Sequence, residues 1–132
     1  MRYALWFRWA VLIGVLQDVV MGVPGIFVPN WVLGWFGEQA AQPIWPAFGS
    51  QMVVLLSLFY IPAALDPYRY RPIAFLTVGA RAAGVLFFLV LWRGQGPAIF
   101  GYIDLFFGVV QATLLWLTLR EPRQAVLEGA PA

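Results

Sequence analysis

The sequence predicts an all-α polytopic membrane protein: a four-transmembrane-helix bundle with a short interfacial helix between the first and second spans. Three observations predict this fold. The chain has 132 residues, of which 62% are hydrophobic and only 11% charged, whereas soluble domains are about 45–50% apolar and about 25% charged. The apolar residues gather in long runs that could each cross a bilayer. These runs are continuous rather than alternating, which favours helices over a β-barrel.

The predicted spans follow from the length of the apolar runs. About 20 helical residues cross the roughly 30 Å hydrocarbon core of a bilayer. Runs of this length occupy residues 4–23, 47–65, 73–92 and 98–119. A chain this short forms one domain, so we expect residues 1–132 to be a single membrane domain that ends in a polar tail over residues 120–132.

The first connection, residues 24–46, is the longest and is rich in proline. Within it, residues 29–38 combine polar and aromatic side chains and are too short to span a bilayer. We predict a short amphipathic helix lying in the interface, with Asn30 as its N-cap and with Trp31, Trp35 and Phe36 in the headgroup layer. Such a segment either anchors the chain or covers a cavity as a lid, and both interpretations stay open.

The arginines predict the orientation. All eight basic residues are arginines. Six of them flank the ends that alternating helices would place on one side: Arg2, Arg8, Arg69, Arg71, Arg120 and Arg123. Because cytoplasmic loops carry the excess of positive charge, we expect both termini and the second connection to be cytoplasmic, in a bacterial cytoplasmic membrane. Arg69 and Arg71 either attract anionic headgroups, by about 1 kcal/mol each, or only set the topology.

The absence of two residue types restricts the chemistry. The chain contains no cysteine and no histidine. Cysteine is needed for disulfides and thiolate metal sites, and histidine is the commonest metal and haem ligand. We therefore expect no metal, no cofactor, no catalytic residue and no enzymatic activity. The few arginines form no basic patch interleaved with aromatics, so nucleic acid is not an expected partner.

Ionisable residues inside membrane helices are functional candidates, because each is costly to insert. Asp18, Arg81 and Asp104 lie within predicted spans, and each shares a helix face with small residues. Such stripes face the bundle interior. We predict a buried polar cluster with Arg81 as its cation and Asp18 or Asp104 as its anion. Three amides are expected to accompany it: Gln17, Gln51 and Gln111.

Three interpretations of this cluster stay open. A buried ion pair can fix the register of the helices without any other role. The same groups can instead form a ligand or proton site, or contact another protein subunit.

Several local patterns resemble the DoxX-like families of small bacterial four-helix membrane proteins. They are Gly22-Val23-Pro24-Gly25, the turn at residues 66–72, Gly79-Ala80-Arg81 and Tyr102-Ile103-Asp104. The resemblance covers most of the chain and implies an accessory or membrane-anchoring component, in some cases with quinone or redox partners. It transfers no catalytic residue set to this sequence.

These observations lead to three hypotheses. The first is a non-enzymatic accessory or structural subunit, whose partners are the bilayer and other membrane subunits or copies of itself. The second is a small transporter that uses Asp18 or Asp104 as a membrane-embedded acid. The third is a lipid- or quinone-binding protein with aromatic side chains around its ligand.

Overall fold

The computed structural model describes residues 2–121, and every regular element in that range is a helix. In chain order the elements are α1 (Arg2–Phe27), α2 (Pro29–Gly34), α3 (Ile44–Phe59), α4 (Ile61–Leu65), α5 (Arg71–Leu86), the π-helical turn η1 (Phe87–Leu91) and α6 (Ala98–Arg120). Four helical segments are long and apolar enough to cross a membrane, namely α1, α3 with α4, α5 with η1, and α6. The predicted all-helical architecture with four such segments is therefore confirmed. The predicted tail, residues 120–132, lies outside the described residues except for Arg120 and Glu121.

The first span is longer than predicted because Pro24 does not end it. The apolar run predicts an end at residue 23, and the proline that follows removes one backbone donor from a helix. In the structure the helix continues to Phe27, and the Val28 amide donates to the Pro24 carbonyl at 2.8 Å. Gly22 and Gly25 lie on the buried side of this stretch, where a Cβ at Gly22 would overlap Val54 of α3. Close packing against α3 thus keeps the end of α1 helical.

The second span is broken into α3 and α4 at Tyr60. Pro62 has no amide hydrogen to donate to the carbonyl four residues earlier. Just before the proline, the Tyr60 amide donates to the carbonyl three residues earlier, that of Ser57, at 3.0 Å. The α-helical pattern of hydrogen bonds between residues four apart resumes with the Ala64 amide and the Tyr60 carbonyl. A proline is a common cause of such a break. The break places Tyr60, which is only 4% exposed, inside the bundle.

The connection between α1 and α3 contains the short helix α2, which ends at Gly34 rather than at residue 38. The prediction of Asn30 as N-cap is wrong, because Val28 occupies that position. The Asn30 side chain instead bonds Ala40 twice, accepting from its amide at 2.8 Å and donating to its carbonyl at 3.2 Å. These bonds close the loop that follows α2.

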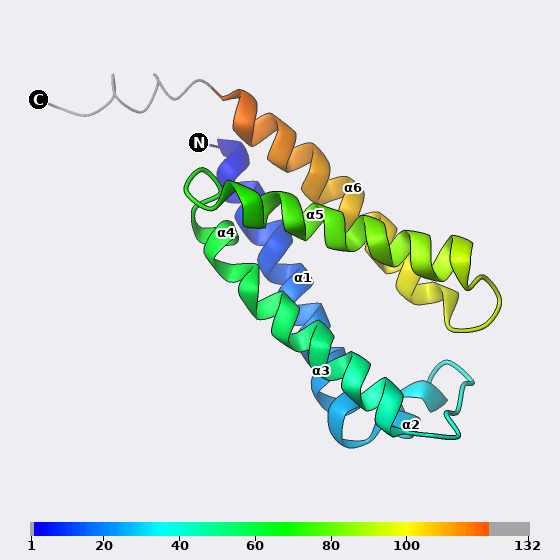
Figure 1. The fold of residues 1–132 in the computed structure, drawn as a ribbon. Helices are drawn as coiled ribbons and strands as arrows, with labels where there is room; N and C mark the ends of the chain where they lie inside the picture. The colour runs from blue at the N-terminus through cyan, green and yellow to red at the C-terminus, as the bar shows by residue number, and fades with distance from the viewer. Residues whose placement is uncertain (1, 122–132) are drawn as a thin grey trace, which may run out of the picture.

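The helices form two hairpins, α1 with α3 and α5 with α6 (Figure 1). The two hairpins contact each other where α1 packs on α6 and where α4 packs on α5. We call the end where α1 begins and α4 turns into α5 the narrow end. The hydrophobic core lies there and includes Phe7, Val11, Ala63, Ala74 and Leu115. At the opposite, wide end, which carries α2 and the connection from η1 to α6, the hairpins diverge.

The outer surface of the bundle is apolar. Large hydrophobic side chains are exposed along every long helix, among them Leu16, Val20, Leu55, Phe75, Phe106 and Val109. The arginines are unevenly distributed, since Arg2 and Arg8 begin α1, Arg69 and Arg71 lie at the α4–α5 turn, and Arg120 ends α6. All of these positions belong to the narrow end, whereas Arg93 lies at the wide end.

Candidate functional site

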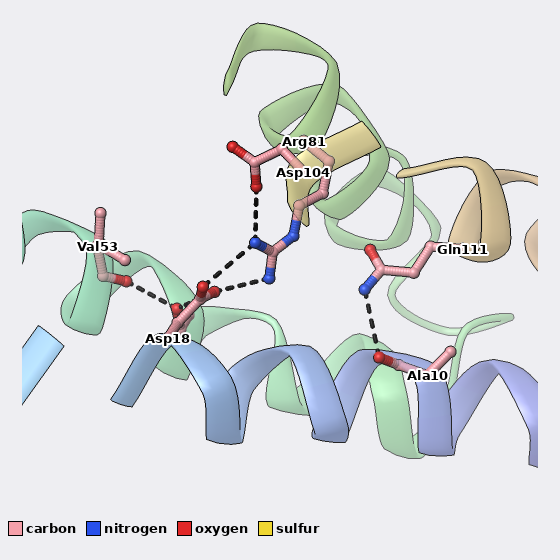
Figure 2. Close-up of polar contacts among 7 residues, drawn as sticks. Ala10, Asp18, Val53, Arg81, Asp104 and Gln111 are labelled. Carbon is pink, nitrogen blue, oxygen red and sulfur yellow. Dashed lines mark hydrogen bonds and ion pairs between the residues drawn. The ribbon is translucent and has the colours of Figure 1, made fainter. Parts of the chain in front are cut away.

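An ion-pair triad joins three helices inside the bundle. Figure 2 shows the Arg81 guanidinium of α5 between the carboxylates of Asp18 from α1 and Asp104 from α6. Arg81 Nη2 lies 2.7 Å from Asp18 Oδ2, and Nη1 lies 3.2 Å from Asp18 Oδ1 and 2.8 Å from Asp104 Oδ1. Asp18 therefore receives a bidentate pair, the geometry that a planar guanidinium favours. One cation thus holds two acids, where the sequence predicted one acid or the other.

Burial differs between the two acids. The side chains of Arg81 and Asp18 are 8% and 9% exposed, whereas that of Asp104 is 18% exposed. Asp18 also has a second partner, because Ser57 Oγ lies 2.8 Å from its Oδ2. The same hydroxyl lies 2.7 Å from the Val53 carbonyl, and its single proton donates to one of them at a time. Asp18 is therefore the firmly held acid, and Asp104 the more accessible one.

Glycines allow the triad to form. A Cβ at Gly14 would lie 3.0 Å from Arg81 Nη2, and a Cβ at Gly108 would lie 3.2 Å from Arg81 Cβ. At Gly84 a Cβ would overlap the Asp104 carboxylate itself. The small residues that the sequence places beside each charged group thus provide the space in which the charges meet.

We expect Gly84→Ala to lower the free energy of unfolding by about 1–3 kcal/mol, because the new methyl group forces the Asp104 side chain away from Arg81. Gly79→Ala is the matched control on the same helix, since a Cβ there meets nothing within 4 Å. Alanine is the better helix former, so the control should be as stable as the parent or slightly more stable. Thermal unfolding in a mild detergent measures both. Equal effects of the two substitutions would contradict the close approach at Gly84.

The three amides do not behave alike. Gln111 is buried, and its Nε2 donates to the Ala10 carbonyl of α1 at 3.4 Å. Gln17 lies beside Asp18, and its Oε1 is buried without a hydrogen-bond partner in residues 2–121. Gln51 is exposed, so its predicted membership of the cluster is corrected. The face of α3 that carries Ser50 and Val54 packs on α1, and Gln51 points elsewhere because adjacent helical residues are about 100° apart.

A cavity of about 630 Å³ lies between the hairpins, and the triad forms part of its wall. Its lining is mainly apolar and includes Val32 and Leu33 of α2, Val53 and Leu56 of α3, and Phe87 and Phe88 of η1. Ligand pockets have volumes of about 300–1,000 Å³ and combine an apolar lining with a few placed polar groups. This cavity has both properties.

The polar residues of the wall include some that the sequence did not indicate. Tyr60 lines the cavity, and its hydroxyl is buried without a hydrogen-bond partner within the described part of the chain. Ser57 was missed as well. The spacing of three between Ser57 and Tyr60, which puts both on one helix face, is the signal that could have indicated them.

The aromatic side chains of the α2 segment lie at the wide end of the bundle. Trp31 and Trp35 are exposed and make an edge contact with ring centroids 4.6 Å apart. Phe36, predicted to lie in the headgroup layer, is only half-buried and packs on Phe100 of α6, with centroids 5.0 Å apart. The ring thus connects the α2 segment with α6 across the wide end, and its place in the headgroup layer stays a prediction.

The basic turn lies at the opposite end of the molecule from α2. Arg69 and Arg71 are both exposed there. Asp66 Oδ1 accepts from the amides of Tyr68 and Arg69, at 3.1 and 3.0 Å, and the Tyr68 hydroxyl donates to the Thr118 carbonyl of α6. These bonds order the turn without using either arginine side chain.

Comparisons with protein-family models, curated proteins and solved structures gave no match for this chain. The resemblance to DoxX-like proteins stays a prediction. In the part of the chain that the structure describes, no group of three or more histidine, cysteine or acidic side chains is placed to hold a metal ion. The site combines a buried ionic group, formed by Asp18, Arg81 and Asp104, with the wall of a mainly apolar cavity.

Proposed function

We propose that this chain is an integral protein of a bacterial cytoplasmic membrane, with both termini and the α4–α5 turn on the cytoplasmic side. Two observations support the proposal. The exposed faces of the long helices are apolar, which suits acyl chains and not water. Within residues 2–121 the arginines at helix ends gather at the narrow end, and Arg93 is the one at the other end. The positive-inside rule assigns the arginine-rich end to the cytoplasm.

Within this setting, the protein binds an amphiphilic, lipid-like molecule. The observation that carries this proposal is the cavity of about 630 Å³, which combines apolar walls with the charged triad. Asp104 is the more accessible acid of the triad, with a side chain that is 18% exposed. A ligand with a polar head and an apolar tail would satisfy both kinds of lining. This proposal corresponds to the third hypothesis from the sequence, a lipid- or quinone-binding protein. A quinone is one member of this class of amphiphilic ligands.

We expect the protein purified in a mild detergent to retain such a molecule. Native mass spectrometry should show an added mass on the wild type, and solvent extraction should identify it. Val53→Trp places a large side chain in the cavity wall and should remove the added mass, whereas Glu38→Gln, outside the cavity lining, should not. An identical mass profile for Val53→Trp and the wild type would contradict the proposal.

The subunit hypothesis is a second candidate, and Gln51 favours it. The side chain is exposed on α3 beside the exposed Met52 and Leu55, and it has no hydrogen-bond partner among residues 2–121. An amide on a lipid-facing helix surface gains from bonding across a helix–helix contact. The same mass spectra record the subunit number, and a monomer that carries no other protein would count against this candidate.

A further inference from the structure

The charge of the cavity wall is unbalanced. Asp18, Arg81 and Asp104 are the charged residues that line it in the described chain. With all three ionised, two carboxylates face one guanidinium, and the wall carries an excess of one negative charge. An unbalanced charge in an apolar setting is costly unless a partner of opposite sign is present. The wall therefore favours a cation over a neutral or anionic head group.

The more accessible acid of the wall points to the same chemistry. The Asp104 side chain is 18% exposed. It bonds Arg81 through Oδ1 alone, and its Oδ2 makes no bond within residues 2–121. A carboxylate oxygen accepts hydrogen bonds and cannot donate. A head group that carries N–H donors would therefore satisfy it, whereas Gln17 Oε1 and the Tyr60 hydroxyl are buried away from the cavity.

Aromatic side chains complete the environment. Trp45, Phe87, Phe88 and Phe100 line the cavity, and the faces of such rings attract cations. Their apolar bodies, together with Val53 and Leu56, suit an alkyl or ring-containing tail. A carboxylate head group would gain none of these contacts and would be repelled by Asp104.

We propose that the cavity binds a cationic amphiphile, a protonated amine on an apolar tail, with its ammonium group at Asp104. This inference rests on the proposed function, because it names the charge of the ligand that the cavity holds. Asp104 is the residue that decides the charge preference, since Asp18 is already engaged by two bonds from Arg81 and by Ser57.

Three probes that share one tail test the proposal. Octylamine, octanol and octanoate are titrated into the detergent-purified protein at neutral pH, where an alkylamine is protonated. Affinity is measured by calorimetry, and thermal unfolding is recorded for each mixture. Octylamine should bind most tightly and raise the unfolding temperature most. Val53→Trp should weaken the binding of octylamine.

Asp104→Asn removes the excess charge while keeping the shape of the side chain. The affinity for octylamine should fall by about tenfold or more, the size expected when a hydrogen bond to a charged group is lost. Glu38→Gln removes one acid outside the cavity lining and should leave the affinity unchanged. The unfolding temperature of unliganded Asp104→Asn shows that the variant is folded.

The outcomes separate the two proposals. Equal affinity for all three probes, or an undiminished affinity of Asp104→Asn for octylamine, would overturn the cationic preference and leave the amphiphile site intact. An affinity of Val53→Trp equal to that of the wild type would place the probes outside the cavity and overturn the preference too. Failure of every probe to bind the wild type would overturn the amphiphile site together with it.

Discussion

Replacing Arg81 with leucine should destabilise the protein by about 3–5 kcal/mol, the cost of removing one partner from a buried ion pair. The substitution leaves Asp18 and Asp104 facing each other without the guanidinium that now bonds both. No other basic residue in the described chain lines the cavity and could replace it. Thermal or denaturant unfolding in a mild detergent measures the loss.

Arg93→Leu is the matched control. This variant makes the same arginine-to-leucine change and removes the same charge. Arg93, unlike the buried Arg81, is exposed in the connection between η1 and α6. Exposed charges contribute little to stability, so this variant should unfold close to the wild type. Equal stability of the Arg81 and Arg93 variants would contradict a structural contribution of the triad.

Asp18→Asn should destabilise the protein by about 2–3 kcal/mol, while Asp104→Asn should change its stability much less. Asp18 accepts two hydrogen bonds from Arg81 and lies within bonding distance of Ser57. An asparagine has only one acceptor oxygen, so the bidentate pair is lost. Asp104 bonds Arg81 through one oxygen, which an asparagine oxygen can replace, and the remaining Asp18–Arg81 pair is then electrically neutral.

The two acids are matched controls for each other. Each substitution removes one of the two negative charges that neighbour the Arg81 guanidinium. The stability of both variants is measured by unfolding in the same detergent. A larger loss of stability for Asp104→Asn than for Asp18→Asn would show that the roles of the two acids are reversed.

Much of the site could be predicted from the sequence. A charged residue in an apolar helix cannot face lipid cheaply, so Asp18, Arg81 and Asp104 were expected to face the interior, and the structure brings them together. Gln51 shows the limit of this reasoning. An uncharged amide costs less to leave on an outer surface than a charge does, and in the structure Gln51 lies there. Polarity alone did not indicate which way it faced.

The cavity could not be predicted, because no local pattern describes how two hairpins diverge. The core at the narrow end uses alanines such as Ala63 and Ala74, which bring the hairpins close together. At the wide end the bulkier aromatic residues of η1 and α6 lie around an open volume instead. The break at Tyr60 depends on Pro62, and both residues are visible in the sequence. The burial of Tyr60 is not, because it follows from the packing of its helix against the others.

The helical class, the four apolar segments and the set of charges expected to avoid lipid all follow from the amino-acid sequence, because each depends on the local cost of placing a residue type in hydrocarbon. Three properties emerge from the packing of the helices instead: one arginine serves two acids, Asp18 is held more firmly than Asp104, and a cavity adjoins them. These properties depend on distances between side chains of different helices, which are set by how the hairpins pack and which no single helix encodes.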